Sequence, residues 1–96
     1  MNYRLVILLQ AQKEMADAVD WYEEQQIGLG ERFIVFVEGF LRRIVQNPLH
    51  FPEKKTPFRE AYVKDFPYLI IYRVYNDEVV VYSVFHTKQS PKKKYL

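Results

Sequence analysis

The sequence predicts an α+β fold of order β-α-α-β-β-β, in which a helical hairpin packs on one face of a small, mostly antiparallel sheet. Two runs of β-branched and aromatic residues, 66–74 and 78–86, are typical of paired strands. Two earlier segments, 11–26 and 31–47, instead repeat their apolar side chains at helical spacing. A chain of 96 residues can bury one core, so we expect residues 1–96 to form a single domain.

The composition is that of a folded protein with little net charge. Apolar residues make up 49% of the chain and the net charge is only +2, which argues against a disordered chain and against a polycation. There is no cysteine, which excludes disulfides, thiolate metal sites and a cysteine nucleophile, and the two distant histidines offer no zinc spacing. The apolar run 5–9 is too short to span a membrane. We therefore expect a cytoplasmic protein with no metal, no other cofactor and no membrane partner.

The first element is predicted to be a strand over residues 3–9, which is apolar on both faces and should therefore be covered by its neighbours. The next segment has the period of a helix. Its apolar stripe consists of Ala11, Met15, Ala18, Val19 and Tyr22. Trp21 lies beside the stripe and is assigned to the core. We expect this helix to end near Gln26, because Gly28 and Gly30 can both take a positive φ.

A second helix is predicted from about Glu31 to Asn47, where the following proline ends it. Its apolar stripe consists of Phe33, Val37, Phe40, Leu41 and Ile44. The short link makes the two helices antiparallel neighbours. Residues 49–57 are predicted to be a loop and residues 58–66 a further strand. In that strand Arg59, Ala61 and Val63 share one face, and Glu60, Tyr62 and Lys64 share the other.

The last two strands are predicted to form a hairpin whose loop residues are Asn76 and Asp77. This register places Tyr75 opposite Glu78, Arg73 opposite Val80, Ile71 opposite Tyr82, and Leu69 opposite Val84. The face toward the helices then carries Tyr68, Ile70, Tyr72, Val74, Val79, Val81, Ser83 and Phe85. The open face carries Leu69, Ile71, Arg73, Val80, Tyr82, Val84, His86 and Lys88. Because polar groups are spread along it, the open face is the expected functional surface.

Several short motifs occur together in an order that resembles one protein family. They are residues 21–25 and 28–33, Asn47-Pro48, Phe51-Pro52, Arg59, Phe66-Pro67-Tyr68, Ile71-Tyr72, Phe85-His86-Thr87 and Pro91. Nearly the whole chain thereby resembles the RelE/ParE family of bacterial toxins from type II toxin–antitoxin modules, and it looks closer to the ParE-like branch. The resemblance implies the same fold and a cognate antitoxin, with which the toxin forms a hetero-oligomer.

The resemblance also implies one of two targets. ParE-like toxins resemble inhibitors of DNA gyrase, whereas RelE-like toxins resemble ribonucleases that cut messenger RNA on the ribosome. The ribonucleases carry an arginine at the start of the strand that matches residues 68–72, where this chain has Leu69. A basic residue near the end of their last strand has a match in Lys88, and their final aromatic has an approximate counterpart in Tyr95.

His86 and Lys88 are the candidate catalytic residues if the chain is a ribonuclease. RNA cleavage without a metal needs a base, an acid and cations around the phosphate, and an ordinary histidine titrates near neutrality. Arg73 shares their predicted face but lies about 26 Å from Lys88 along the sheet. The two cations could therefore line one groove, but they cannot share one phosphate. The alternative for His86 is a structural or antitoxin-facing role.

The candidate residues for binding a target or the antitoxin are Arg59, Arg73, Tyr82, Lys92, Lys93, Lys94 and Tyr95. Tyr82 could stack on a base or pack on Ile71 across the hairpin. Arg59 could bind a phosphate or a carboxylate, or pair with an acidic residue of the first helix. The lysines could attract nucleic acid or an acidic segment, or form a solvated tail.

Three functions follow as hypotheses. The leading one is a growth-inhibiting toxin, of the kind that stabilises plasmids, which acts on DNA gyrase and is neutralised by its antitoxin. The second is a ribosome-dependent endoribonuclease, and the third is a degenerate member that only binds its antitoxin. The gyrase hypothesis leads because the sequence resembles the ParE-like branch and because Leu69 stands where the ribonucleases have an arginine.

Overall fold

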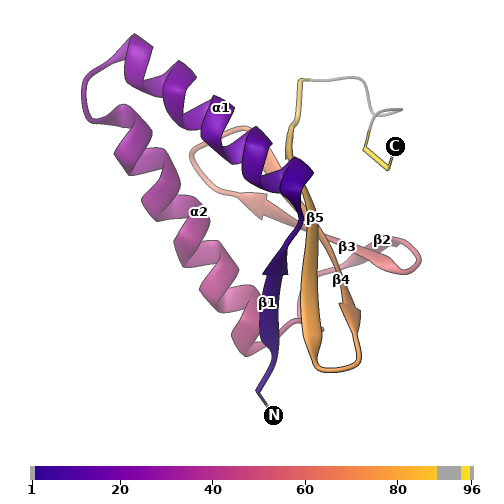
Figure 1. Cartoon of the computed structure of the whole chain (residues 1–96). Helices are drawn as coiled ribbons and strands as arrows, with labels where there is room; N and C mark the ends of the chain where they lie inside the picture. The colour runs from indigo at the N-terminus through magenta and orange to yellow at the C-terminus, as the bar shows by residue number, and fades with distance from the viewer. Residues whose placement is uncertain (1, 89–93, 96) are drawn as a thin grey trace.

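The computed structural model describes residues 2–88 and 94–95. In chain order its elements are β1 (Arg4–Ile7), α1 (Leu9–Gln25), α2 (Leu29–Gln46), β2 (Glu53–Lys55), β3 (Phe58–Val63), β4 (Tyr68–Tyr75) and β5 (Glu78–His86). The strands form one sheet in the order β1-β5-β4-β3-β2, and the α1–α2 hairpin lies on one side of it (Figure 1). β1 runs parallel to β5, and the other neighbours are antiparallel. The predicted α+β fold and element order are confirmed, with β2 as an additional short strand.

The link between the two helices is held by the side chain of Glu23. Its carboxylate accepts the backbone N–H groups of Gly28 (2.9 Å) and Gly30 (3.1 Å), donors that the start of α2 would otherwise leave free. Of the two glycines only Gly28 has a positive φ, +89°. Gly30 is buried instead, and a Cβ there would lie 2.6 Å from the carbonyl oxygen of Val19. Glycine at this position therefore allows α1 and α2 to approach closely.

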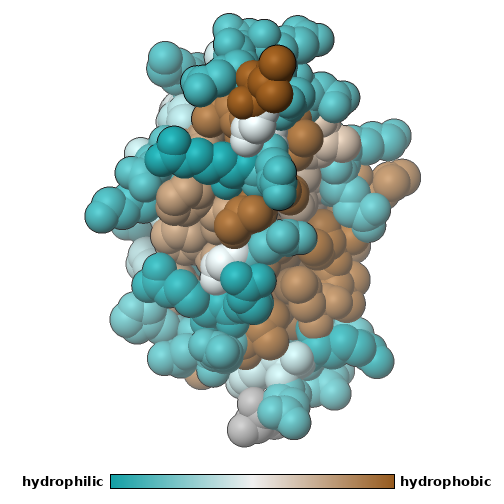
Figure 2. Space-filling view, turned by 90° about the vertical axis from the view of Figure 1, so that its left-hand side faces the viewer, coloured by the Kyte–Doolittle hydropathy of each residue, from teal (hydrophilic) through white to brown (hydrophobic). Residues whose placement is uncertain are grey.

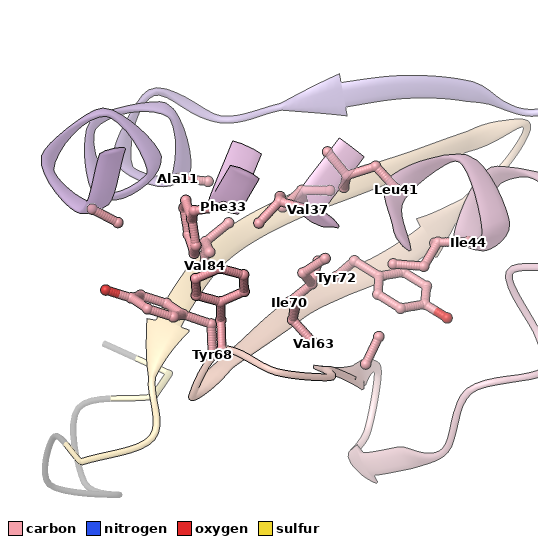
Figure 3. Packing of buried hydrophobic residues seen from close by; sticks show 14 of the residues in the cluster. Ala11, Phe33, Val37, Leu41, Ile44, Val63, Tyr68, Ile70, Tyr72 and Val84 are labelled. Carbon is pink, nitrogen blue, oxygen red and sulfur yellow. The ribbon is translucent and has the colours of Figure 1, made fainter. Parts of the chain in front are cut away.

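The core lies between the helical hairpin and the sheet (Figure 3). The helices contribute Ala11, Ala18, Tyr22, Phe33, Val37, Leu41 and Ile44, and the sheet side contributes Ala61, Val63, Phe66, Tyr68, Ile70, Tyr72, Val79, Val81 and Val84. The predicted burial of Tyr72 and Val81 is confirmed, since both are fully buried. The assignment of Trp21 to the core is wrong. Its side chain is 57% exposed, because it lies at the edge of the apolar stripe of α1.

β1 is an edge strand and not the covered strand that its sequence predicts. It aligns residues 4–7 with 78–81 of β5, and Arg4 forms an ion pair with Glu78. The side chain of Ile7 packs against the core, whereas that of Leu5 is 37% exposed. The strand is therefore covered on one face only in part, and its outer edge is free of any described strand.

β2 occupies part of the segment that was predicted to be a loop. Glu53 aligns with Arg59 and Lys55 with Phe58, so the strand forms one arm of a short hairpin with β3. Its three residues are exposed. Lysines and flanking prolines give no strand signal, so the pairing with β3 could not be predicted from local sequence.

The hairpin of β4 and β5 contains a β-bulge. Near the turn the predicted register is confirmed, because Tyr75 pairs with Glu78 and Arg73 with Val80. Farther from the turn, Tyr72 pairs with Val81, but Ile71 pairs with Ser83. Tyr82 is therefore an extra residue in β5 without a partner in β4.

Beyond the bulge the side chains of β5 lie on the opposite faces from those predicted, because one inserted residue shifts the alternation by one. Val84 aligns with Ile70 and belongs to the core instead of the open face. Ser83 and Phe85 align with Ile71 and Leu69, so their side chains leave the core, although the Ser83 hydroxyl still donates to Glu14 of α1. His86 aligns with Tyr68 and lies on the helical side.

Candidate functional site

The side of the sheet away from the helices carries a shallow hollow beside Arg73. The hollow has a volume of about 250 Å³ and is lined by Arg73, Tyr75, Val80 and Tyr82. The guanidinium carbon of Arg73 lies 5.2 Å from the centre of the Tyr75 ring, a cation–π contact. Its Nε is buried and has no hydrogen-bond partner among the described residues. Buried donors are normally paired, so this hollow suits a ligand group that brings an acceptor.

Tyr82 separates this hollow from a second one. Its ring meets Phe58 edge-on, with the ring centres 5.0 Å apart, because the bulge removes it from the predicted position opposite Ile71. On its other side is a cavity of about 90 Å³. That cavity is lined by Leu8, Gln10, Phe58, Ile71, Tyr82, Ser83, Lys94 and Tyr95. Tyr82 therefore lines each of these two cavities.

His86 does not join Arg73 and Tyr82, contrary to the prediction. Its ring meets the Tyr68 ring edge-on at 4.9 Å on the helical side of the sheet. Its Nδ1 accepts the backbone N–H of Lys88 at 3.0 Å. With Nδ1 occupied as an acceptor, this nitrogen is not free to take a proton from a substrate. Lys88 is exposed and follows the end of β5.

A larger hollow of about 460 Å³ lies between α1 and the end of β5. It is lined by Glu14, Asp17, Ala18, Trp21, Tyr68, Val84 and His86. Oε1 of Glu14 accepts the hydroxyl of Ser83 (2.9 Å) and the backbone N–H of Val84 (3.0 Å), which fixes α1 against β5. Burial, together with nearby Tyr22 and Glu14, raises the pKa of Tyr68 to about 12. The two carboxylates make this hollow unfavourable for a phosphate group.

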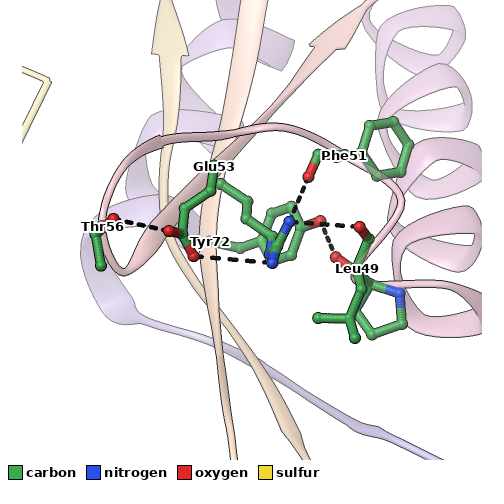
Figure 4. Close-up of polar contacts among 7 residues, drawn as sticks. Leu49, Phe51, Glu53, Thr56 and Tyr72 are labelled. Carbon is green, nitrogen blue, oxygen red and sulfur yellow. Dashed lines mark hydrogen bonds and ion pairs between the residues drawn. The ribbon is translucent and has the colours of Figure 1, made fainter.

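Arg59 holds the loop that precedes β2 (Figure 4). Its Nη1 donates to the carbonyl oxygens of Phe51 (2.8 Å) and Leu49 (3.4 Å), and its Nη2 lies 3.8 Å from a carboxylate oxygen of Glu53. A pair with an acidic residue of α1, one of the predicted partners, is not formed. The guanidinium thus binds groups of its own chain, and a phosphate would have to compete with them.

The C-terminal pair Lys94 and Tyr95 lies on the side of the sheet away from the helices. Both side chains contact the carboxylate of Glu60, which is only 7% exposed. Lys94 is therefore not the solvated lysine that one interpretation of the tail expects. Lys92 and Lys93, which were predicted to act with it, lie outside the described residues.

A groove of about 320 Å³ follows the free edge of β1. It is lined by Leu5, Ile7, Met15, Glu38, Leu41 and Arg42. The unpaired backbone of an edge strand is a template for another strand. Figure 2 shows, on the side formed by the helices, that apolar surface is exposed between the polar side chains. The groove therefore has mainly apolar walls and lies beside an edge strand whose outer side pairs with no described strand.

Sequence reasoning missed two carboxylates that the structure uses. Glu14 and Glu60 are not among the candidate residues that the sequence predicts, because nothing in the sequence identifies their distant partners. Among the described residues, no set of three or more His, Asp and Glu side chains is arranged to hold a metal ion. None of the described helices has the length and hydropathy needed to cross a membrane.

The chain matches known proteins in sequence pattern and in fold. Residues 5–91 match the family model described as "ParE toxin of type II toxin-antitoxin system, parDE". A solved structure described as "Chromosomal ParDE TA system from P. aeruginosa" has a TM-score of 0.80 at 12% sequence identity, over 90% of this chain and 97% of that chain. At this identity the likeness shows a shared fold. No curated protein sequence matches the chain.

Proposed function

Because the chain belongs to the family of ParE toxins of type II toxin–antitoxin systems, we propose that it inhibits growth by binding DNA gyrase and that a cognate antitoxin neutralises it. Membership of the family itself implies an antitoxin partner. In this proposal the protein works in the cytoplasm and serves plasmid stabilisation. It acts by binding a protein target and not by cutting RNA.

The observation that carries the proposal is the separation of the residues that a ribonuclease would need together. Arg73 and Tyr82 lie on one side of the sheet, and His86 lies on the other. Arg59 donates to carbonyl groups of its own loop, and Nδ1 of His86 is occupied by the backbone of Lys88. The described residues thus offer a phosphodiester no joint set of base, acid and cation.

We propose that gyrase binds at the hollow of Arg73, Tyr75 and Tyr82. Arginine and tyrosine are among the side chains that most often dominate protein–protein binding energies. The buried Nε of Arg73 supports the proposal, because a partner oxygen placed there would pair a donor that is already desolvated.

A supercoiling assay with purified gyrase tests this proposal. The wild-type chain should inhibit supercoiling at micromolar concentration, and Arg73→Ala should need about tenfold more protein for the same effect. Lys13→Ala is the matched control, because Lys13 is an exposed cation on α1 that lines neither hollow on the open side. Thermal unfolding of each variant checks that it is folded. No inhibition by the wild-type chain at micromolar excess would refute gyrase as the target.

We further propose that a segment of the antitoxin occupies the groove at β1. The support is that an extended segment could pair with the free edge of β1 while its apolar side chains contact Leu5, Met15 and Leu41. Arg42 and Glu38 line the same groove and would favour an antitoxin segment with charged residues of the opposite sign beside them.

Co-purification with the product of the adjacent reading frame tests the antitoxin site. Leu5→Glu should weaken capture about tenfold or more, because it places a charge in the apolar groove. Val35→Glu introduces the same charge at a position on α2 that is 55% exposed and outside the groove, and it should have no effect. Equal capture by both variants would exclude this groove as the antitoxin site.

A further inference from the structure

Glu60 is a buried carboxylate on the side of the sheet that has no helices. It lies on β3 opposite Ile71 and next to Ala61, whose side chain belongs to the core. An uncompensated buried carboxylate is strongly unfavourable. Two groups from the C-terminal end compensate it. The ammonium of Lys94 lies 3.3 and 3.4 Å from its two oxygens, and the hydroxyl of Tyr95 donates to one of them.

The ring of Tyr95 is also held on this side of the sheet. It packs against Phe58, with ring centres 5.3 Å apart, and the ammonium of Lys55 lies 5.1 Å from its centre. Burial and then the hydrogen bond with Glu60 raise the pKa of the Tyr95 hydroxyl. We call Lys94 and Tyr95 the latch.

The side chains of the latch leave part of the surface beneath them unfilled. The cavity of about 90 Å³ beside Tyr82 lies against Lys94 and Tyr95. Its walls are largely apolar, formed by Leu8, Phe58 and Ile71. Protein interiors are normally packed with few voids larger than a water molecule, and this volume is several times the minimum that one water needs. A side chain with a larger ring than that of tyrosine would therefore gain contacts in this cavity.

We propose that the surface beneath the latch is a docking site for a protein segment that presents an aromatic side chain next to a lysine or arginine. The occupant must bring a cation, because it must replace Lys94 at the buried Glu60. It must bring an aromatic ring, because it must cover Phe58, Ile71 and Tyr82. In the absence of that partner the latch occupies the site. This proposal is independent of gyrase as the target.

Lys94 and Tyr95 follow the end of β5 closely in the sequence, so the latch is covalently joined to the domain that carries its binding surface. Such short tethers give effective concentrations on the order of millimolar. A free peptide with the same chemistry is therefore expected to compete only in that range, whereas a protein partner gains affinity from contacts elsewhere. One such contact surface is adjacent, since Tyr82 lines both the latch cavity and the hollow of Arg73.

A single thiol under the latch reports whether it is open. The chain has no cysteine, and Ser83 lines the cavity with only 3% exposure. The Ser83→Cys protein therefore carries one thiol, and its rate of reaction with a soluble disulfide reagent measures access. Adding Tyr95→Ala should speed labelling about tenfold or more, because a hydrogen bond to a charged group is lost along with the ring. Tyr95→Phe should give a smaller increase.

Tyr62→Ala in the same Ser83→Cys background is the control. Tyr62 lies on the same strand as Glu60 and is 58% exposed, so labelling should not change. Labelling that is equally slow in the Tyr95→Ala and Tyr95→Phe proteins would show that the latch does not cover the site, and it would overturn the proposal. If Tyr95→Ala does not fold, the comparison of Tyr95→Phe with the Ser83→Cys protein decides. An unchanged labelling rate in Tyr95→Phe would overturn the proposal.

Peptides then identify the chemistry of the occupant. In the Tyr95→Ala, Ser83→Cys protein, the pentapeptide Lys-Lys-Lys-Tyr-Leu at millimolar concentration should protect the thiol, and Lys-Lys-Lys-Trp-Leu should protect it more strongly. The peptide Lys-Lys-Lys-Ala-Leu should not protect. Equal protection by the alanine and tyrosine peptides, or protection by an acidic peptide of the same length, would refute the required pairing of cation and ring.

Discussion

Tyr72 illustrates how one side chain joins the core to the loop before β2. Its ring is fully buried among the core residues, and its hydroxyl donates to the carbonyl oxygen of Pro48 at 2.5 Å (Figure 4). The carbonyl group is buried with Pro48, so removal of the hydroxyl leaves an acceptor without a partner.

Tyr72→Phe should lower the free energy of unfolding by about 1–2 kcal/mol, because the ring is kept and only this hydrogen bond is lost. Urea denaturation with a matched Tyr62→Phe variant measures the difference. Tyr62 is 58% exposed and should change stability by less than about 0.5 kcal/mol. Equal effects of the two substitutions would show that the bond to Pro48 contributes nothing.

His86 provides the residue-level test of the two targets. In the proposed function His86→Ala should leave growth inhibition within about twofold of wild type, because the ring lies on the helical side and its Nδ1 is occupied. Induced growth curves measure this, and primer extension on translated messages detects any cleavage. Cleavage that occurs in wild type and is lost in His86→Ala would instead support the ribonuclease.

Single residues differ in how well the sequence predicts them. Tyr72 and Val81 are correctly predicted because their burial follows from strand alternation near the turn. Glu60 is not, because the residues that cover it lie more than thirty positions away in the sequence. Arg73 was identified as a binding candidate, but its unpaired Nε depends on packing that only three-dimensional structure supplies.

At the level of elements, the helices and the β4–β5 turn are the parts that sequence patterns predict. Both helices begin two residues earlier than expected, and the turn has the expected loop residues, with Asn76 at a φ of +55°. The bulge at Tyr82 could not be predicted, because the uninterrupted run of β-branched and aromatic residues around it fits either register. That one feature moves His86 to the helical side and thus changes the interpretation of the site.

The two glycines within α2 should respond to alanine in opposite directions. Gly30→Ala should destabilise the protein by about 1–3 kcal/mol, because its Cβ would meet the backbone oxygen of Val19 at 2.6 Å. Gly39→Ala should stabilise it by about 0.5–1 kcal/mol, since its Cβ would have only the side chain of Arg42 nearby, at 3.8 Å. Thermal and urea unfolding of both variants check the signs. A destabilising Gly39→Ala would contradict this account of helix packing.

For the whole molecule, buried tyrosines make stability depend on alkaline pH. Burial raises the pKa of Tyr68 and of Tyr72 to about 12, whereas a tyrosine in an unfolded chain titrates near pH ~10. Between these values the folded protein binds more protons than the unfolded chain, so the free energy of unfolding falls as the pH rises. Below pH ~10 this contribution is fully present.

Urea midpoints between pH ~9 and ~12 measure the decline. Lysines also titrate in this range, so the comparison with Tyr72→Phe isolates the tyrosine. That variant should lose stability less steeply than wild type, because one of the groups with a raised pKa is absent. Identical slopes for the two proteins would show that Tyr72 does not contribute.

The parallel pairing of β1 with β5 has a consequence for synthesis of the chain on the ribosome. Residues 4–7 are made first, yet their partners are residues 78–81, and β5 also supplies Val79, Val81 and Val84 to the core. During translation the helical hairpin therefore leaves the ribosome without the strand that completes its sheet. The nascent chain has no finished toxin surface until nearly all of it has emerged. Under the proposed function, an antitoxin already present in the cell would meet each new molecule at the moment when it first becomes able to act.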